Sequence, residues 1–233
     1  MMRHLATSFT HYHNTHTLFP NSTRLTVSFL NKHYPKKSYN KTIMEGEAAL
    51  HQLDRNWTLW YDSPSTYNAE DWEKSLVPVI TVHSVEEFFA MLRYMKPLHA
   101  LRTSAQYHFF QEGVKPMWED EANKKGGKIW MNVEINKNDA TDANSSTKTE
   151  LDKLWENVLM SLIGESLEEE GEENESQIMG VVISKKKYYN RVAVWVRDAD
   201  NTKAIENITS RLTSGVALPP SVKLGFAKHG EKA

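Results

Sequence analysis

The sequence predicts an α+β fold, in which three amphipathic helices interrupt a set of antiparallel strands and pack on one face of the sheet. Two patterns predict it: short segments in which apolar and polar residues alternate, and longer segments with apolar residues at helical spacing. A chain of 233 residues with 39% apolar residues is also long enough for one sizeable domain. The face of the sheet without helices must then be either wet or a binding site.

Six segments have the strand pattern. Each is short, rich in β-branched or aromatic residues, and mostly alternates apolar with polar positions. They are residues 57–61, 106–110, 128–135, 178–184, 191–196 and 221–226.

Three segments have the helix pattern. The first begins at Ser84, and Glu87 three residues later predicts a capping box ahead of an apolar stripe. The second ends at Gly164, and its apolar positions are Leu151, Leu154, Trp155, Val158, Leu159 and Leu162. The third carries Ala204, Ile205, Ile208 and Leu212. Two polar runs, residues 135–150 and 164–177, predict loops.

Charge is distributed unevenly along the chain. Residues 1–44 contain no acid and six of the 28 cations, a composition typical of a disordered arm, with a transit-like leader or a translation start at Met44 as alternatives. We therefore expect an arm over residues 1–49 and one domain over residues 50–233. Beyond residue 44 the other 22 cations face all 30 acids, a formal charge of −8, which argues against a general single-strand RNA binder with a basic groove.

Composition also excludes several classes of site. The chain has no cysteine, which rules out disulfides and thiolate metal sites and is typical of a reducing, cytoplasmic compartment. No apolar run is long enough to cross a membrane. There is no nucleophile elbow, histidine-rich metal spacing or phosphate-cradling glycine loop. We expect neither an enzyme nor a bound cofactor or metal.

Two of the seven tryptophans have no strand or helix to bury them. Trp72 lies in "NAEDWEKS", and Trp118 directly precedes three acids in "GVKPMWEDEANKKGGK". Either could be a loop anchor that folds back on the core, but two exposed indoles beside an acid and several cations suggest a ligand slot. The other five, for which we expect core or half-buried packing, are Trp57, Trp60, Trp130, Trp155 and Trp195.

The chain resembles a known family through five motifs. These are "HQLDRNWTLWY", "SVEEFFAML", "GVKPMWEDEANKKGGK", "LIGES" and "LPPSVKLGF", in this order over residues 51–229. They are similar to the mRNA cap-binding translation initiation factor 4E family. The resemblance implies a curved antiparallel sheet with three helices on its convex face and a ligand slot for the cap on its concave face.

The resemblance also implies how the cap base is held. By analogy Trp72 and Trp118 would stack on the two faces of the positively charged 7-methylguanine, which adds cation–π attraction to stacking. Glu119 would accept hydrogen bonds from N1–H and the exocyclic amine of guanine. Trp195 matches the indole whose edge lies near the 7-methyl group. Asp120 and Glu121 are expected to be structural or solvated.

The phosphate-binding positions implied by the resemblance are Lys186 and Arg191, with Lys128 approaching through water. The chain has Lys186 where the family commonly has Arg, and Tyr188 where Lys is usual. Lysine lacks the bidentate fork of arginine, so we expect weaker phosphate binding. Lys185 and Lys187 are interpreted as residues of a solvated turn.

The convex face is implied to dock a short helical motif of a scaffold or repressor protein. His51, Val85, Phe89, Glu156 and Met160 match that surface. Phe89 replaces a Trp, and Glu156 places a carboxylate where the family has Leu, so we expect an unpaired charge in an apolar groove. The function implied is cap binding in translation initiation. A cap-binding repressor or mRNA-storage paralogue remains the alternative.

Overall fold

The computed structural model describes residues 49–63, 75–134, 148–169, 175–216, 218 and 221–231. The chain divides into two units, Met1–Leu50 and His51–Ala233, and the description below concerns the second. Trp72, most of the expected N-terminal arm and most of the polar run at 135–150 lie outside the described residues. The arm over residues 1–49 therefore stays a prediction.

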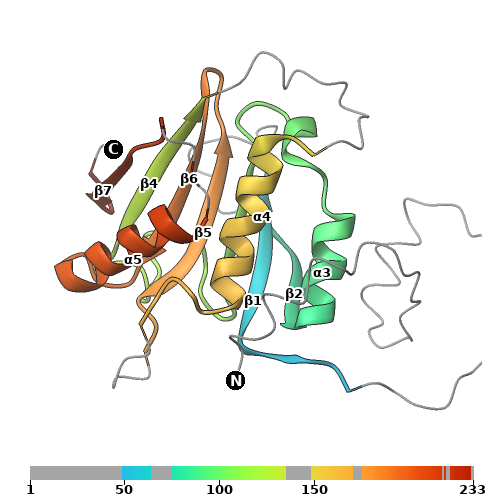
Figure 1. Ribbon diagram of the computed structural model, residues 1–233, viewed down its shortest axis with the longest axis horizontal. Coiled ribbons are helices and arrows are strands. Elements are labelled where there is room, and N and C mark those ends of the chain that lie inside the picture. The colour runs from blue at the N-terminus through green and yellow to red at the C-terminus, as the bar shows by residue number, and fades with distance from the viewer. Residues whose placement is uncertain are drawn as a thin grey trace, which may run out of the picture. The chain divides into compact units, whose positions relative to one another are not determined.

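Seven strands form one antiparallel sheet (Figure 1). In chain order they are β1 (Gln52–Asp62), β2 (Leu76–Ser84), β3 (Gln106–Gln111), β4 (Gly127–Glu134), β5 (Ile178–Lys185), β6 (Tyr189–Val196) and β7 (Leu224–Lys228). Their order across the sheet is β2-β1-β3-β5-β6-β4-β7. The sheet is curved and open, and the predicted fold class is confirmed.

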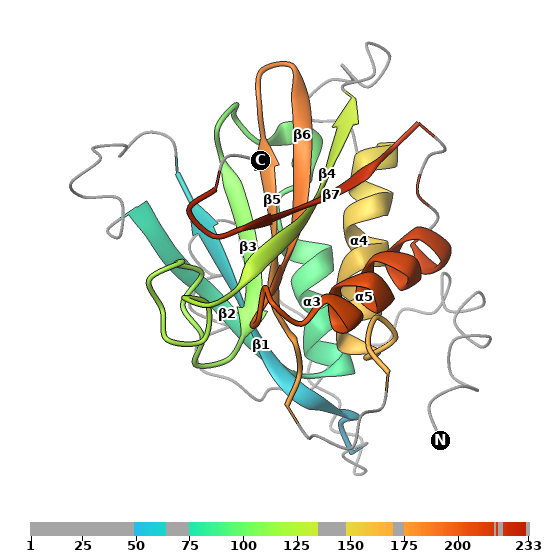
Figure 2. The same ribbon diagram turned by 90° about the vertical axis from the view of Figure 1, so that its left-hand side faces the viewer.

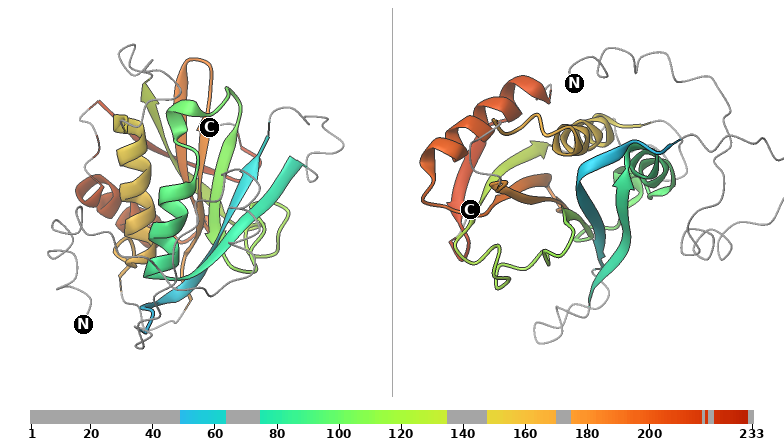
Figure 3. Two further views of the ribbon diagram at one scale, coloured as in Figure 1. Left: turned by 90° about the vertical axis from the view of Figure 1, so that its right-hand side faces the viewer. Right: turned by 90° about the horizontal axis from the view of Figure 1, so that it is seen from below.

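The three helices cover one face of this sheet (Figures 1 and 2). They are α3 (Val85–Tyr94), α4 (Glu150–Ile163) and α5 (Thr202–Gly215), and a 3-10 turn, η4 (Leu98–Ala100), follows α3. Viewed from below in Figure 3, the helices lie side by side along the outside of the curved sheet. The opposite, concave face carries no helix in the described part of the chain.

One strand of the sheet, β2, was not predicted from the sequence. β2 contains Pro78 and has no regular alternation of buried and exposed residues, and proline argues against a central strand. In the structure β2 is an edge strand that pairs only with β1 among the described strands, so one of its sides needs no ladder hydrogen bonds. The sixth predicted strand, residues 221–226, is observed at Leu224–Lys228, so it begins three residues later and ends two residues later than expected.

The capping box predicted for α3 is only half present. The Ser84 hydroxyl accepts a hydrogen bond from the Glu87 amide at 3.2 Å, as expected. The Glu87 carboxylate, however, accepts from the amide of His83 at 2.8 Å rather than from that of the cap residue. The reciprocal arrangement occurs at α4, where Thr149 and Asp152 cap each other.

Strand alternation separates a large core from a small one. Beneath the helices lie Trp57 and Trp155, 2% and 1% exposed, within a continuous apolar cluster. On the concave face Phe110, Met179 and Val182 form a second cluster. Three further tryptophans were expected to pack against the core, and all three are half-buried: Trp60, Trp130 and Trp195. The predicted packing of these five indoles is confirmed.

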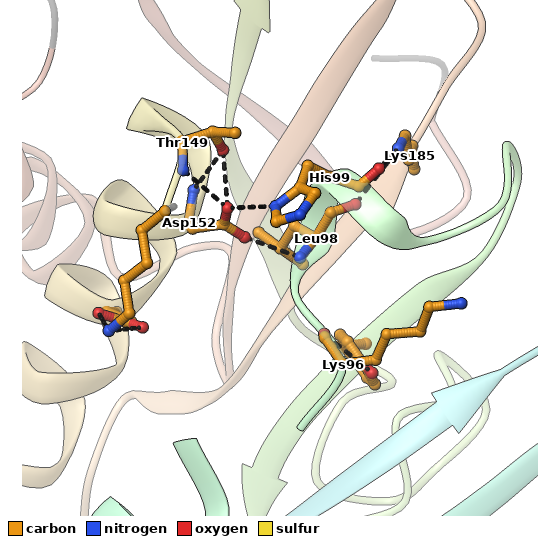
Figure 4. Close-up of polar contacts among 9 residues, drawn as sticks. Lys96, Leu98, His99, Thr149, Asp152 and Lys185 are labelled. Atoms are coloured by element: carbon orange, nitrogen blue, oxygen red, sulfur yellow. Dashed lines mark hydrogen bonds and ion pairs between the residues drawn. The ribbon is translucent and has the colours of Figure 1, made fainter. Parts of the chain in front are cut away.

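A buried carboxylate ties the start of α4 to η4, and carbonyl oxygens of η4 in turn bind the end of β5 (Figure 4). Asp152 accepts hydrogen bonds from the amide of Leu98 at 2.7 Å, from the amide of Thr149 at 2.9 Å and from the Thr149 hydroxyl at 2.8 Å, and His99 Nδ1 lies 2.9 Å from its Oδ2. Lys185 Nζ donates to the carbonyl oxygens of Leu98 and His99 at 3.2 and 2.8 Å. The interpretation of Lys185 as a solvated turn residue was therefore wrong, because η4 carbonyls bind its ammonium group.

Candidate functional site

The loop between β3 and β4, residues 112–126, presents Trp118 and Glu119 to solvent. Two polar side chains brace it from inside. Asp120 accepts from the amides of Lys115 at 3.2 Å and Ala122 at 2.9 Å. Asn123, fully buried, donates to the carbonyl oxygens of Lys115 and Met117 at 2.9 and 2.8 Å. An aromatic residue and an acid therefore project from a loop that is internally hydrogen-bonded.

Two glycines allow this loop to return close to the sheet. A Cβ atom on Gly126 would lie 2.0 Å from the carbonyl oxygen of Val196 on β6, and one on Gly127 would lie 2.6 Å from the ring of Phe226. Neither space admits a side chain. The "KKGG" sequence at the start of β4 thus holds the end of the loop against the sheet.

The side chains of Trp118 and Glu119 remain accessible. Trp118 is 53% exposed, and the Glu119 carboxylate makes no hydrogen bond or ion pair with the described residues. The expectation for the two following acids is confirmed: Asp120 is structural, and the solvated Glu121 pairs with Lys124 at 2.5 Å. Trp72 lies outside the described residues, so the stacking pair with Trp118 stays a prediction.

Two of the predicted phosphate-binding residues lie together on the concave face. Lys128 on β4 and Arg191 on β6 alternate with the buried residues Ile129 and Val192, which face the helices. Burial and then the charge of Arg191 lower the pKa of Lys128 below its usual value. The positive charge of Arg191 therefore disfavours the protonated form of Lys128.

The guanidinium of Arg191 is positioned by three neighbours. Its Nε donates to Asn132 Oδ1 at 3.0 Å, and its carbon atom Cζ lies 4.9 Å from the ring centre of Trp130 and 5.5 Å from that of Tyr189. The third predicted phosphate residue, Lys186, is exposed at the turn between β5 and β6. This turn is closed by a hydrogen bond from the Lys186 amide to the carbonyl of Tyr189 at 3.0 Å.

Trp195 lies on the same face, directly opposite Lys128 in the strand register. Its ring packs edge-on against Phe110 at 5.3 Å between centres, and His229 lies 4.2 Å from it. Burial and then the neighbouring charge of Lys128 lower the pKa of His229 to about 4. The indole is half-buried, so part of it still faces the concave side.

A row of polar side chains crosses the concave face and was not predicted. Gln106 on β3 donates to Asp62 on β1 at 2.9 Å and accepts from Ser184 on β5 at 2.5 Å. Next to this row, His108 is 3% exposed, and neither ring nitrogen has a hydrogen-bond partner among the described residues. Burial lowers the pKa of His108 to about 3. The alternation within "QYHFFQ" places Gln106 and His108 on one face of the sheet. No local sequence signal, however, indicates that Gln106 contacts β1 and β5.

The predicted partner surface lies on the convex face, on α3 and α4. Phe89 and Met160 are 38% and 39% exposed, and Val85 is half-buried. His51 Nδ1 lies 2.7 Å from the carboxylate of Glu86. Val85, Phe89, Glu156 and Met160 lie on α3 and α4, which are neighbours on this face (Figure 1), whereas His51 directly precedes β1.

Glu156 is not the unpaired charge that was expected. Lys148 Nζ lies 2.7 Å from its carboxylate. Sequence reasoning missed this pair because Lys148 precedes the helix cap, and its eight-residue distance from Glu156 corresponds to no helical contact across a regular turn.

Among the described residues, no group of three or more histidine, aspartate and glutamate side chains could hold a metal ion. None of the described helices is both long and apolar enough to span a bilayer.

Comparison with known proteins decides the family. The family model for eukaryotic initiation factor 4E matches residues 52–233. The chain belongs to the eukaryotic initiation factor 4E family. This is a family of translation initiation factors rather than of enzymes, and the resemblance stated from the five sequence motifs is confirmed.

Individual members of the 4E family match over most of both chains. Eukaryotic translation initiation factor 4E of Candida albicans is 36% identical over 193 residues, which cover 82% of this chain and 86% of the relative. Among solved structures, Ascaris suum eIF4E-3 in complex with the m7G cap matches with a TM-score of 0.66 and 30% identity, over 79% of this chain and 95% of that one. Caenorhabditis elegans eIF4E-3, in complex with the 4E-binding protein Mextli and a cap analog, matches with a TM-score of 0.65 and 27% identity, over 78% and 94%.

Proposed function

We propose that this chain binds the 7-methylguanosine 5′ cap of mRNA in the cytoplasm and acts in translation initiation. The observation that carries the proposal is the pairing of an exposed Trp118 with an uncommitted Glu119 on a braced loop, in a family whose Ascaris suum member is solved with the m7G cap. The cap has a cationic base and an anionic triphosphate. The residues available match both charges.

Trp118 and Trp72 would sandwich the methylated base. An indole attracts a cationic ring through cation–π interaction as well as stacking, and the two effects together reach about 2 kcal/mol or more in a desolvated slot. Glu119 would accept from the guanine N1–H and amine. Adenine presents an acceptor at its N1, so this carboxylate selects guanine. Trp195 would place its edge near the methyl group.

Lys128, Lys186 and Arg191 would hold the triphosphate. Because Arg191 lowers the pKa of Lys128, a phosphate placed beside both cations relieves their mutual repulsion in addition to its own attraction to each. Asn132 and Trp130 keep the guanidinium in place before the ligand arrives. Lys186 contributes a mobile point charge without a bidentate fork.

The convex surface formed by His51, Val85, Phe89, Glu156 and Met160 would receive a helical segment of a scaffold or repressor protein. Support comes from the exposed apolar side chains of Phe89 and Met160 and from the Caenorhabditis elegans family member that is solved with a 4E-binding protein. Cap binding and partner binding would then occupy opposite faces of the sheet, so one chain could hold both at once.

The test is titration of 7-methyl-GDP and of GDP against the chain, followed by tryptophan fluorescence. We expect the methylated nucleotide to bind far more tightly, and Trp72→Ala or Trp118→Ala each to cost about 1–3 kcal/mol. Glu119→Ala should cost a similar amount because two guanine donors lose their acceptor. The matched control is Glu121→Ala, which removes an exposed acid two residues away. Equal affinity for the two nucleotides would defeat the proposal.

The phosphate contacts are tested in the same assay with 7-methylguanosine mono-, di- and triphosphate. Affinity should rise with phosphate number and fall with added salt. Lys186→Ala should flatten that rise, Lys186→Arg should strengthen it, and Lys203→Ala on α5 serves as the control. An affinity that does not respond to phosphate number would remove Lys128, Lys186 and Arg191 from the site.

A further inference from the structure

The turn between β5 and β6 exposes a tyrosine that neither the fold nor the proposed cap site uses. Tyr188 is 76% exposed, more than any other large apolar side chain of the described residues. Lys187 Nζ lies 5.1 Å from the centre of its ring. An aromatic ring left in water at the tip of a hairpin gains nothing for the core, and in such a position it is available for stacking.

The surroundings of Tyr188 are cationic. From Ile178 to Val196 the two strands and their turn contain Lys185, Lys186, Lys187 and Arg191 and no acid. Lys185 is bound by η4 carbonyls, whereas Lys186 and Lys187 are exposed. β4, which pairs with β6, contains one acid, Glu134, and it lies opposite Tyr189 at the end of the strand.

An exposed aromatic ring among cations is the combination that proteins use to hold single-stranded nucleic acid. The cations follow the phosphates, and the ring stacks on a base without regard to its sequence. A protein partner would instead favour an aromatic residue with apolar neighbours, and the turn between Lys185 and Asn190 has none besides its two tyrosines.

We propose that Tyr188 stacks on the base of the first transcribed nucleotide of capped RNA, while Lys187 contacts the phosphate that follows it. The inference rests on the proposed function, because it extends the cap site by one nucleotide. Tyr188 is two residues from Lys186 and three from Arg191, the residues proposed to hold the triphosphate. The first transcribed nucleotide is joined to the far end of that triphosphate, and Tyr188 is the exposed ring beside the cations proposed to hold it.

The experiment compares two ligands, 7-methyl-GTP and a capped dinucleotide with 2-aminopurine as its first transcribed base. In the wild type we expect the dinucleotide to bind more tightly and the 2-aminopurine emission to be quenched by stacking. Tyr188→Ala should lower dinucleotide affinity about 5-fold or more, leave 7-methyl-GTP affinity unchanged and abolish the quenching. Tyr188→Phe should retain both effects, and Tyr94→Ala, an exposed tyrosine on α3, is the control.

The outcomes separate this inference from the proposed function. If Tyr188→Ala changes neither affinity nor emission, or lowers both affinities equally, the stacking role is wrong while cap binding stands. If the wild type binds 7-methyl-GTP no better than GTP, the cap site itself is wrong and the inference falls with it. Loss of affinity in Tyr188→Ala with quenching retained would also overturn the stacking role.

Discussion

Lys148 Nζ lies 2.7 Å from the carboxylate of Glu156, and the pair neutralises the one acid among the residues assigned to the convex partner surface. Glu156 and Met160 are four residues apart on α4 and share a face of the helix. The side chain of Glu156 is 21% exposed and that of Lys148 is 57% exposed. A partner helix that contacts Met160 would therefore also cover an ion pair.

The first prediction concerns the affinity of an amphipathic peptide helix with an apolar contact face. Covering the pair removes two charges from water, so Glu156→Leu should tighten binding about 10-fold. Lys148→Ala should weaken binding, because it leaves the carboxylate unpaired beneath the peptide. Isothermal titration of one peptide against the wild type and both variants measures these changes.

The control for this prediction is the double variant. Once Glu156→Leu has removed the carboxylate, Lys148→Ala should have little further effect. Tight wild-type binding that Glu156→Leu does not improve would show that the pair lies outside the peptide contact.

The second prediction concerns Asp152 as a junction between α4 and η4. Burial alone would raise its pKa, but the hydrogen bonds from His99, Thr149 and Leu98 outweigh burial and hold the pKa below its usual value. Asp152→Asn should lower the free energy of unfolding by about 1–3 kcal/mol at neutral pH. Urea unfolding measures the change, and Asp200→Asn, which removes an exposed partner of Lys228, is the matched control.

The sign of the pH dependence follows from the lowered pKa of Asp152. The stabilisation is present above the pKa of the unfolded carboxyl, about 4, and is lost as the pH falls through the lower folded value. The difference between wild type and Asp152→Asn should therefore shrink below about pH 4. A difference that stays constant from pH 7 to pH 3 would contradict a charged role for Asp152.

The third prediction concerns His108, whose pKa burial lowers to about 3. The unfolded chain takes up a proton near pH 6.5, whereas folded His108 stays neutral, so acid favours unfolding. Between pH 6 and pH 5 this histidine should approach a slope of about 1.4 kcal/mol of lost stability per pH unit. His108→Leu should remove that share of the slope in urea unfolding series. An unchanged slope would show that His108 is accessible to protons in the folded chain.

Local sequence signals predicted most of the fold. Gly164 ends α4 as expected, because a terminating glycine acts on the adjacent backbone groups. β2 was missed because Pro78 is acceptable only at the edge of a sheet, and the edge position is decided by the other strands. The Glu87 carboxylate accepts from the amide of His83 instead of that of the cap residue Ser84. The two amides are neighbours in the chain, so the spacing of Ser84 and Glu87 could not show which of them donates.

The candidate site could be predicted in part. Trp118 and Glu119 are identifiable from an aromatic residue and acids in a polar loop, and their exposure agrees with that interpretation. Asp120 and Asn123, which hold the loop, resemble any other polar loop residues until their bonds to Lys115 and Met117 are seen. The Gln106 row has the same property, because its partners come from strands far away in the chain.

The sequence by itself determined the fold class, the family resemblance and the residue types available for a cationic base and its phosphates, since periodicity, caps and motifs depend on neighbours in the chain. Only the tertiary structure decided that Lys148 neutralises Glu156, that η4 binds Lys185 and that Arg191 is held by Asn132 beside Trp130. Lys148 and Glu156 belong to one segment, and their contact depends on how the chain enters α4 before its cap at Thr149. The contacts of Lys185 and Arg191 join different elements. They form because the packing of helices and strands brings the two groups within bonding distance, and that packing is the outcome of the whole core rather than of any one segment.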